Sequence, residues 1–307
     1  MALSAELVAV IVAVTQGHPR VLTTHCARAL PAGPLHQSHR SLQTGLRQWV
    51  LEQTQHHLAY VEQLYTFADK GRFYASGERV ISVSYLGLTI ESNSHQRHEV
   101  GWQEWYRYFP WEDWRQGMPT SLNERIIPAL KQWVYSDQAF ASVRWQRVAH
   151  AFGLEGFTWN EDMVLQRYEL LYEAGLVIEA QRNSMEIVQT AADPVYGLSM
   201  RYDHRRILAT GVARLRAKIK YRPVMFELMP EAFSLLQLQQ TVEAITGRLL
   251  HKQNFRRLVE QQNLIEETGA LTAGAAGRPA KLFQFKNDVI AARAIAGTKL
   301  PLAKQAR

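Results

Sequence analysis

Apolar runs and alternating positions along the first ninety residues predict a β-sheet with a single helix. A helix is expected over Ser41–Gln53, because Ser41 is a suitable N-cap and Leu46 and Val50 recur at helical spacing. The segment Leu30–Pro34, rich in proline and glycine, is predicted as a loop. The predicted strands are Leu7–Val14, Arg20–Thr24, Val61–Phe67 and Val80–Ile90. This order of elements is typical of an α/β or α+β domain.

Beyond residue 100 the hydrophobic period becomes helical. Ser121–Glu124 (SLNE) has the form of a capping box before a helix. Ser136–Phe152 and Asn160–Ala174 are expected as two further helices. Residues 100–195 are therefore predicted to form a helix-rich insertion in, or extension of, the sheet domain.

Half of the chain's eight tryptophans lie within residues 101–115, whose sequence is GWQEWYRYFPWEDWR. Aromatic side chains beside Arg107 and Arg115 could stack on a base. Such a cluster is more often a packing nucleus or an interface, and packing is the favoured interpretation. Pro110 argues against one continuous helix across the segment.

The C-terminal third begins with two helical patterns. Arg201–Lys220 predicts an amphipathic basic helix, which is interpreted as a solvated connection. Ser234 can cap a second helix over Leu235–Thr246, which Gly247 would end.

A third helix and a β-hairpin complete this region. The helix is expected over His251–Gln262, with Phe255 and Leu258 on its buried face. Strands are expected at Leu264–Thr268 and Lys281–Lys286, joined by a glycine-rich segment. A helix, a turn, a helix and a hairpin are the plan of a winged helix-turn-helix domain.

The distribution of charge supports this interpretation. The 307 residues include 35 Lys and Arg against 28 Asp and Glu, which gives a net charge of +7. Residues 201–307 hold 19 of the basic and 8 of the acidic residues, so they carry +11 and the first 200 residues carry −4. A basic module on a slightly acidic body is typical of nucleic-acid binding, and a solvated basic surface is the alternative.

A recognition helix presents polar and basic groups of its N-terminal half to base edges in the major groove. A glycine-rich wing lets the backbone approach phosphates, and its basic residues can reach the minor groove. The candidate DNA-contacting residues are Lys252, Asn254, Arg256, Arg257, Arg278 and Lys281. Double-stranded DNA is therefore the expected macromolecular partner.

Length and composition exclude several classes of protein. At ~100–200 residues per domain, the chain is expected to form about two domains. The single cysteine, Cys26, rules out a disulfide framework and a multi-cysteine zinc site, and no metal site is expected. Without an apolar run near the ~20 residues of a membrane span, or a recognisable secretion signal, a cytoplasmic protein with no membrane partner is expected.

The LPAG segment at residues 30–33, the helix that follows, and EQLYTF and SVSYLGL within residues 62–88 resemble a Nudix domain. In that family, glutamates of the helix hold Mg²⁺ against a pyrophosphate, because hard cations need several oxygen ligands. The helix here reads RQWVLEQT over Arg47–Thr54, and Glu52 is its only carboxylate. One carboxylate is a poor platform for metal-assisted hydrolysis, so the domain is expected to bind a ligand without catalysis.

This resemblance implies a nucleotide effector and no resident cofactor. Aromatic and arginine side chains near the expected pocket could supply stacking and phosphate contacts. The candidate effector-binding residues are Tyr65, Phe67, Arg72, Arg79 and Tyr85. Each could equally be a strand-face or loop residue that touches no ligand.

Residues 7–95 and 200–286 resemble the Nudix-related transcriptional regulators of NAD metabolism. The C-terminal matches are YDHRRIL, LRAKIKYRPVMFELMP, LLHKQNFRR, LIEETG and GRPAKLFQF. The middle region resembles the longer, alphaproteobacterial-type repressors of NAD biosynthesis genes. The family implies a homodimeric repressor, a palindromic operator, and NAD, ADP-ribose or ATP as effector. An active Nudix pyrophosphohydrolase of ADP-ribose-type dinucleotides and a scaffold that binds a protein through its Trp-rich middle are the alternatives.

The expected fold class is α+β, with a Nudix-like α/β/α sandwich and a C-terminal winged helix-turn-helix domain. The expected segments are a sensor domain at 1–200 with its helical insertion at about 100–195, a linker helix at 201–221, a DNA-binding domain at 222–288 and a tail at 289–307.

Overall fold

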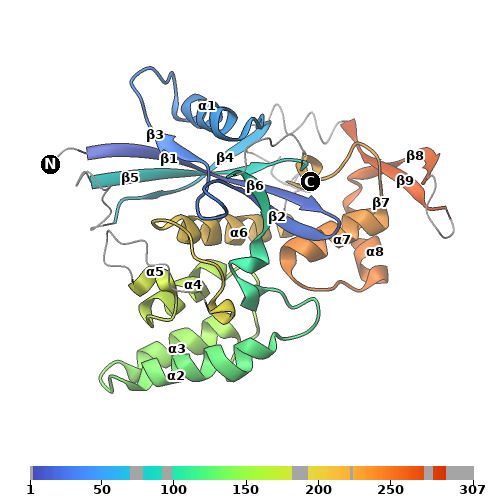
Figure 1. The fold of residues 1–307 in the computed structure, drawn as a ribbon. Coiled ribbons are helices and arrows are strands. Elements are labelled where there is room, and N and C mark those ends of the chain that lie inside the picture. Colours follow the sequence, from blue (N-terminus) through green and yellow to red (C-terminus); the bar gives the residue numbers. More distant parts are fainter. Residues whose placement is uncertain are drawn as a thin grey trace, which may run out of the picture.

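A mixed sheet lies between helix α1 (Leu42–Thr54) on one face and helix α6 (His204–Tyr221) on the other (Figure 1). The computed structural model describes residues 3–69, 79–91, 99–181, 193–221, 224–272 and 279–287. Smaller helices lie beyond α6, and the C-terminal module lies beside one end of the sheet. None of the described helices is long and apolar enough to cross a membrane.

The large sheet contains six strands in the described part of the chain. These are β1 (Leu3–Thr15), β2 (His18–Thr23), β3 (Ala32–Pro34), β4 (Tyr60–Phe67), β5 (Arg79–Leu88) and β6 (Gly101–Glu104). Their order is β4-β5-β1-β2-β6, with β3 paired to β1. The β1–β5 pair is parallel, with Leu7 opposite Val83, and the other pairs are antiparallel. The four predicted strands are confirmed, whereas Leu30–Pro34 is not simply a loop because its last three residues form β3.

Helix α1 covers one face of the sheet, as predicted. The Ser41 hydroxyl accepts a hydrogen bond from the backbone N–H of Thr44 at 3.2 Å and so caps the helix. Leu46 and Val50 are fully buried against the sheet. The helix ends at Gln55, whose left-handed backbone has a φ of 56°.

Helix α6 covers the other face and is a central element of the core. Leu208 and Val212 are buried, and Gly211 lets the helix approach β1 so closely that an added Cβ would lie 2.8 Å from Val10 Cγ1. The interpretation of this helix as a solvated connection is therefore wrong. The basic pattern was misleading because Arg205 and Arg216 are 1% and 0% exposed and form buried ion pairs.

The middle region is helical, as predicted, but its helices begin later. They are α2 (Ile127–Tyr135), α3 (Ala141–Phe152), α4 (Val164–Glu173) and α5 (Ile178–Gln181). Two 3₁₀ turns, Trp105–Arg107 and Pro110–Glu112, and a π-helical turn, Leu122–Ile126, precede them. The capping box expected at Ser121 is wrong, because Ser121 has helical backbone angles and makes no side-chain cap.

The Trp-rich segment is a packing nucleus, as the favoured interpretation held. Trp105 and Trp111 are fully buried, together with Tyr108 and Phe109. They belong to one hydrophobic core that continues from the sheet to Phe255 in the C-terminal module.

The C-terminal module has the predicted helix-turn-helix and hairpin. Its elements are a 3₁₀ turn (Val224–Leu228), β7 (Phe233–Ser234), α7 (Leu235–Thr246), α8 (Lys252–Gln262), β8 (Ile265–Leu271) and β9 (Lys281–Phe285). Ser234 and Gln237 form a capping box at the start of α7, with bonds of 3.2 and 2.8 Å. Gly247, with a φ of 73°, ends α7 as expected.

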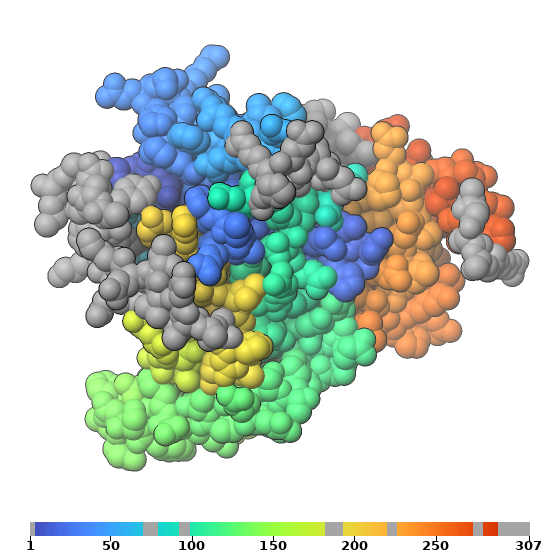
Figure 2. All heavy atoms as spheres, in the orientation of Figure 1, coloured from blue at the N-terminus to red at the C-terminus, as the bar shows by residue number. Residues whose placement is uncertain are grey.

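The hairpin carries a third strand that the sequence pattern did not predict. Strand β7 pairs with β9, which gives the order β7-β9-β8. Two residues are too few to show the alternation by which strands are recognised. In the space-filling view the module packs along the side of the body, next to the segment that follows residue 100 (Figure 2). Helix α7 also contacts β1 and β2.

Candidate nucleic-acid interface and sensor region

Helix α8 presents a polar and basic surface. Lys252, Asn254, Arg256 and Arg257 are all exposed, whereas Phe255 between them is buried and attaches the helix to the core. The sequence pattern therefore separates the anchoring face from the outward face correctly at these positions. Leu258 was expected on the buried face, but 53% of it is exposed, so that assignment is wrong.

Side chains of α7 fix the turn before α8. The Gln239 amide donates to the Leu250 carbonyl at 3.0 Å and to the Glu243 carboxylate at 2.8 Å. The Leu250 N–H donates to the same carboxylate at 2.8 Å. These bonds hold the N-terminus of α8 in place relative to α7, which a recognition helix requires.

The wing contributes one described basic candidate. Lys281 is exposed and its ammonium group contacts the Glu267 carboxylate on the neighbouring strand at 2.8 Å. The wing is closed by the Thr272 N–H, which donates to the Ala280 carbonyl at 2.8 Å. Arg278, the other candidate in the wing, lies outside the described residues.

Three of the proposed effector residues lie at one end of the β4–β5 pair. The ring centroids of Tyr65 and Phe67 are 5.0 Å apart, and the Arg79 guanidinium donates to the Ala68 carbonyl at 3.0 Å. Tyr65 is 58% exposed, while Phe67 is buried. Arg72 lies outside the described residues.

Helix α6 reaches the same place. The guanidinium carbon of Arg206 lies 5.4 Å from the centre of the Phe67 ring. Arg206 also donates to Asp69 at 2.9 Å and to Glu169 of α4 at 2.8 Å. This arginine therefore connects the end of β4 to the helical region.

Tyr85, the fifth effector candidate, is not brought together with the others. It lies on the opposite face of the sheet, buried under α1 with Leu46 and Val50, and burial raises the pKa of its hydroxyl. The Tyr85 side chain is buried and offers no exposed surface to an effector. Its effector role stays a prediction.

The helix that corresponds to the Nudix helix uses its polar side chains for internal contacts. The Gln53 amide accepts from the Ala32 N–H at 3.2 Å and donates to the Ala32 carbonyl at 2.6 Å, so it holds the first residue of β3. Gln48 donates to the Glu52 carboxylate at 2.8 Å. Within the described ranges, no group of three or more His, Cys, Asp or Glu side chains is arranged to hold a metal ion.

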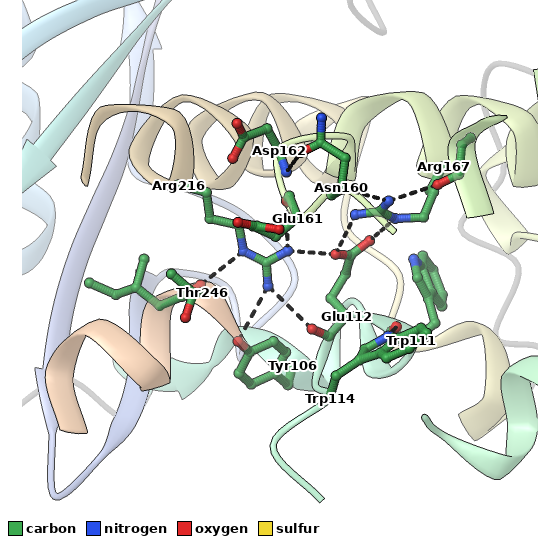
Figure 3. A network of polar contacts seen from close by, with 12 residues as sticks. Tyr106, Trp111, Glu112, Trp114, Asn160, Glu161, Asp162, Arg167, Arg216 and Thr246 are labelled. Carbon is green, nitrogen blue, oxygen red and sulfur yellow. Dashed lines mark hydrogen bonds and ion pairs between the residues drawn. The ribbon is translucent and has the colours of Figure 1, made fainter. Parts of the chain in front are cut away.

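A buried ion-pair network joins the Trp-rich segment, which contains Glu112, to helices α4 and α6 (Figure 3). The Glu112 carboxylate accepts two hydrogen bonds from Arg167, at 2.6 and 2.8 Å, and one from Arg216, at 2.6 Å. The exposed fraction of each of the three side chains is at most 1%. Charged groups this deep are stable only when paired and hydrogen-bonded.

Burial is the largest single influence on the Glu112 carboxyl, and it raises the pKa. The neighbouring guanidinium groups of Arg167 and Arg216 outweigh it and hold the pKa below its ordinary value. Glu112 is therefore ionised in the folded protein at neutral pH, and two positive charges surround one negative charge.

The same network holds the end of α7. Arg216 donates to the Ile245 carbonyl at 2.8 Å, and the Tyr106 hydroxyl donates to the Ala244 carbonyl at 2.7 Å. The backbone N–H of Trp114 donates to the Gly247 carbonyl at 2.7 Å. Carbonyls in the last turn of a helix have no hydrogen-bond donor within the helix. Here the body supplies the donors.

A stack of side chains runs beside the ion pairs. Arg248, in the turn between α7 and α8, lies 5.4 Å from the centre of the Trp114 ring, and Trp114 stacks on Trp159 at 4.3 Å. Arg167 covers the Trp159 ring at 3.8 Å. No local sequence pattern indicates this network, since Glu112 lies 55 positions from Arg167 and 104 positions from Arg216.

Comparison with known proteins identifies the C-terminal module. Residues 225–285 match the family described as the NrtR DNA-binding winged helix domain. The chain is 38% identical over 88 residues to the ADPR responsive transcriptional repressor NtrR of Acinetobacter baylyi. That match covers 29% of this chain and 35% of the relative, so it spans about a third of the length of the curated protein.

Solved structures share the fold over most of the chain. NrtR of Shewanella oneidensis in complex with a 27mer DNA has a TM-score of 0.55 and 19% identity, with 94% of this chain and 95% of that chain covered. A MutT/nudix family protein from Enterococcus faecalis has a TM-score of 0.51 and 15% identity over 93% and 87% of the two chains. The predicted α+β fold, a Nudix-like domain with a C-terminal winged helix, is confirmed, as is the resemblance to Nudix-related regulators in that fold and in the C-terminal domain.

Proposed function

We propose that this chain, which joins a Nudix-like body to an NrtR-type winged helix domain, is a ligand-responsive transcriptional repressor of NAD biosynthesis genes. The proposal rests first on the exposed basic surface of α8, in a module that matches a DNA-binding family over residues 225–285. DNA phosphates attract such a surface, and its polar groups can reach base edges.

In this proposal Lys252, Asn254, Arg256 and Arg257 contact the operator through α8, and Lys281 and Arg278 contact it through the wing. A longer, alphaproteobacterial-type repressor would bind a palindromic operator as a homodimer, because two-fold protein symmetry matches two-fold DNA symmetry. The protein would then act in the cytoplasm, on DNA.

The effector is proposed to be a nucleotide, with ADP-ribose as the first choice and NAD and ATP as the others. The Acinetobacter relative is described as ADPR responsive, which favours this choice. The end of the β4–β5 pair, with an exposed Tyr65 ring and the Arg79 guanidinium, offers stacking and phosphate contacts.

We further propose that the protein is not an enzyme. Glu52 is the only carboxylate in the segment that corresponds to the Nudix helix, and the adjacent glutamine, Gln53, is hydrogen-bonded to the β3 loop. One carboxylate supplies too few oxygen ligands for Mg²⁺. Incubation with ADP-ribose and Mg²⁺ should release no AMP, and metal-dependent release would favour the pyrophosphohydrolase instead.

The decisive test measures operator binding by mobility shift. The variant Arg256→Ala/Arg257→Ala should lose specific binding while its melting temperature stays unchanged, because both side chains are exposed. The control Arg28→Ala/Arg40→Ala removes the same charge from exposed sites on the body and should bind as the wild type does. Equal binding by both double variants would refute α8 as the recognition helix.

A further inference from the structure

The C-terminal end of α7 is hydrogen-bonded to the body, in addition to the contacts that α7 makes with β1, β2 and α6. Three backbone carbonyls there, those of Ala244, Ile245 and Gly247, accept hydrogen bonds from the Tyr106 hydroxyl, the Arg216 guanidinium and the Trp114 backbone N–H. Since the α7–α8 turn is itself fixed by Gln239 and Glu243, the direction of α8 follows the direction of this end of α7.

Glu112 organises the donors of that attachment. Its carboxylate binds Arg216 at 2.6 Å, and its carbonyl accepts a second bond from Arg216 at 3.3 Å. The Tyr106 hydroxyl accepts from Arg216 at 3.3 Å while it donates to Ala244. A guanidinium held by five acceptor groups in a dry interior, among them the Glu161 carbonyl at 3.0 Å, has one favourable position, so the acceptors that it contacts are held in one position too.

Helix α6 links this attachment to the proposed effector region. Arg206 contacts the Phe67 ring and Asp69 at the end of β4, and Arg216 contacts α7. The two arginines are ten residues apart on one continuous helix, a rise of about 15 Å. One continuous helix therefore contacts both the end of β4 and the end of α7.

We propose that the junction formed by Tyr106, Glu112 and Arg216 positions the helix-turn-helix on the body and couples effector binding to operator affinity. The coupling part rests on the proposed repressor function. The positioning part concerns the orientation of α8 alone. Glu112 and Tyr106 are positioning residues, since neither is placed against DNA or nucleotide.

Two buried tyrosines provide a matched test. The Tyr106 hydroxyl donates to Ala244 of α7 at 2.7 Å, and the Tyr108 hydroxyl donates to Ala27 of the body, also at 2.7 Å. Tyr106→Phe and Tyr108→Phe each remove one oxygen and the bond that it donates to a carbonyl, and Tyr106→Phe also removes the bond that the hydroxyl accepts from Arg216. Only the first removes a contact between the body and the DNA-binding module.

The first measurement is the ratio of operator dissociation constants with and without ADP-ribose. We expect Tyr106→Phe to reduce this ratio at least threefold and Tyr108→Phe to leave it unchanged. Arg248→Gln, which removes the cation from the Trp114 stack and leaves the buried ion pairs intact, should act like Tyr106→Phe. A wild-type ratio in both Tyr106→Phe and Arg248→Gln would overturn the coupling.

The second measurement needs neither DNA nor effector. Spin labels at exposed positions of α1 and α8, introduced as Gln43→Cys and Gln261→Cys in a Cys26→Ser background, report the distance between body and module. Tyr106→Phe should broaden or shift the distance distribution, and Tyr108→Phe should not. If the wild type binds no operator or answers no nucleotide, the repressor proposal fails, yet the distances still decide the positioning claim. Identical distributions in all three proteins would overturn it.

Discussion

The Glu112 carboxylate and the Arg216 guanidinium meet at 2.6 Å in the interior, although 104 positions separate them in the chain. Both side chains are at most 1% exposed, and Arg167 completes the group from the other side. Removal of one partner from a buried pair leaves an uncompensated charge in a medium that cannot solvate it. The network therefore requires the Trp-rich segment, α4 and α6 to pack together.

Glu112→Gln should lower the free energy of unfolding by about 3–5 kcal/mol, because two guanidinium groups lose the carboxylate that is hydrogen-bonded to both. Chemical denaturation at neutral pH measures this change. The exposed Glu173 offers a control, since it binds Arg147 with similar geometry, at 2.6 and 2.7 Å. Glu173→Gln should cost less than about 1 kcal/mol. Equal losses in the two variants would contradict the importance of burial.

The stability that Glu112 contributes should depend on pH. Its pKa in the folded protein lies below the ordinary value, since Arg167 and Arg216 outweigh the effect of burial. A lowered folded pKa means that this contribution is complete above the unfolded value of about 4.3 and is lost as the pH falls through the folded value. The difference in unfolding free energy between wild type and Glu112→Gln should therefore shrink below about pH 4.

Denaturation curves of both proteins between neutral and acidic pH test this expectation. Other carboxyl groups titrate equally in the two proteins, so their contributions cancel in the difference. A difference that stays constant down to acid pH would mean that Glu112 is not the titrating group.

The sequence predicted the elements whose signals are local. The Ser41 and Ser234 caps, the Gly247 stop and the apolar strand at Val80–Ile90 are each read from a few adjacent residues, and the structure confirms them. In α8 the apolar Phe255 indicates the buried side of the helix, and the basic residues on the other side are exposed.

The sequence did not predict what depends on contacts between distant segments. Helix α6 was interpreted as solvated because arginines usually face water, whereas Arg205 and Arg216 are buried next to Glu179 and Glu112. No spacing rule places Glu112 between arginines of two different helices. The buried positions of Phe67 and Tyr85 likewise depend on which faces of the sheet α1 and α6 cover.

The wing should bind DNA more tightly when the carboxylate that pairs with Lys281 is neutralised. Glu267 pairs with Lys281 at 2.8 Å on exposed surface, where it offsets a charge that faces solvent. Glu267→Gln should raise operator affinity and steepen the dependence of affinity on salt, because Lys281 then neutralises a phosphate instead. The exposed Glu124 of the body provides the control, since Glu124→Gln should change neither quantity. A weaker complex with Glu267→Gln would contradict a wing contact through Lys281.

Two glycines with nearly the same backbone conformation separate strain from contact at the junction. Gly247 and Gly269 have φ values of 73° and 80°, so alanine at either position costs about 1–2 kcal/mol of backbone strain. A Cβ at Gly247 would also lie 2.4 Å from the Glu112 carbonyl oxygen, whereas a Cβ at Gly269 meets nothing within 4 Å. Gly247→Ala should therefore lose clearly more unfolding free energy in chemical denaturation, and operator affinity as well, because the end of α7 must move away from Glu112. Equal losses in the two variants would show that the close approach of α7 to Glu112 contributes nothing.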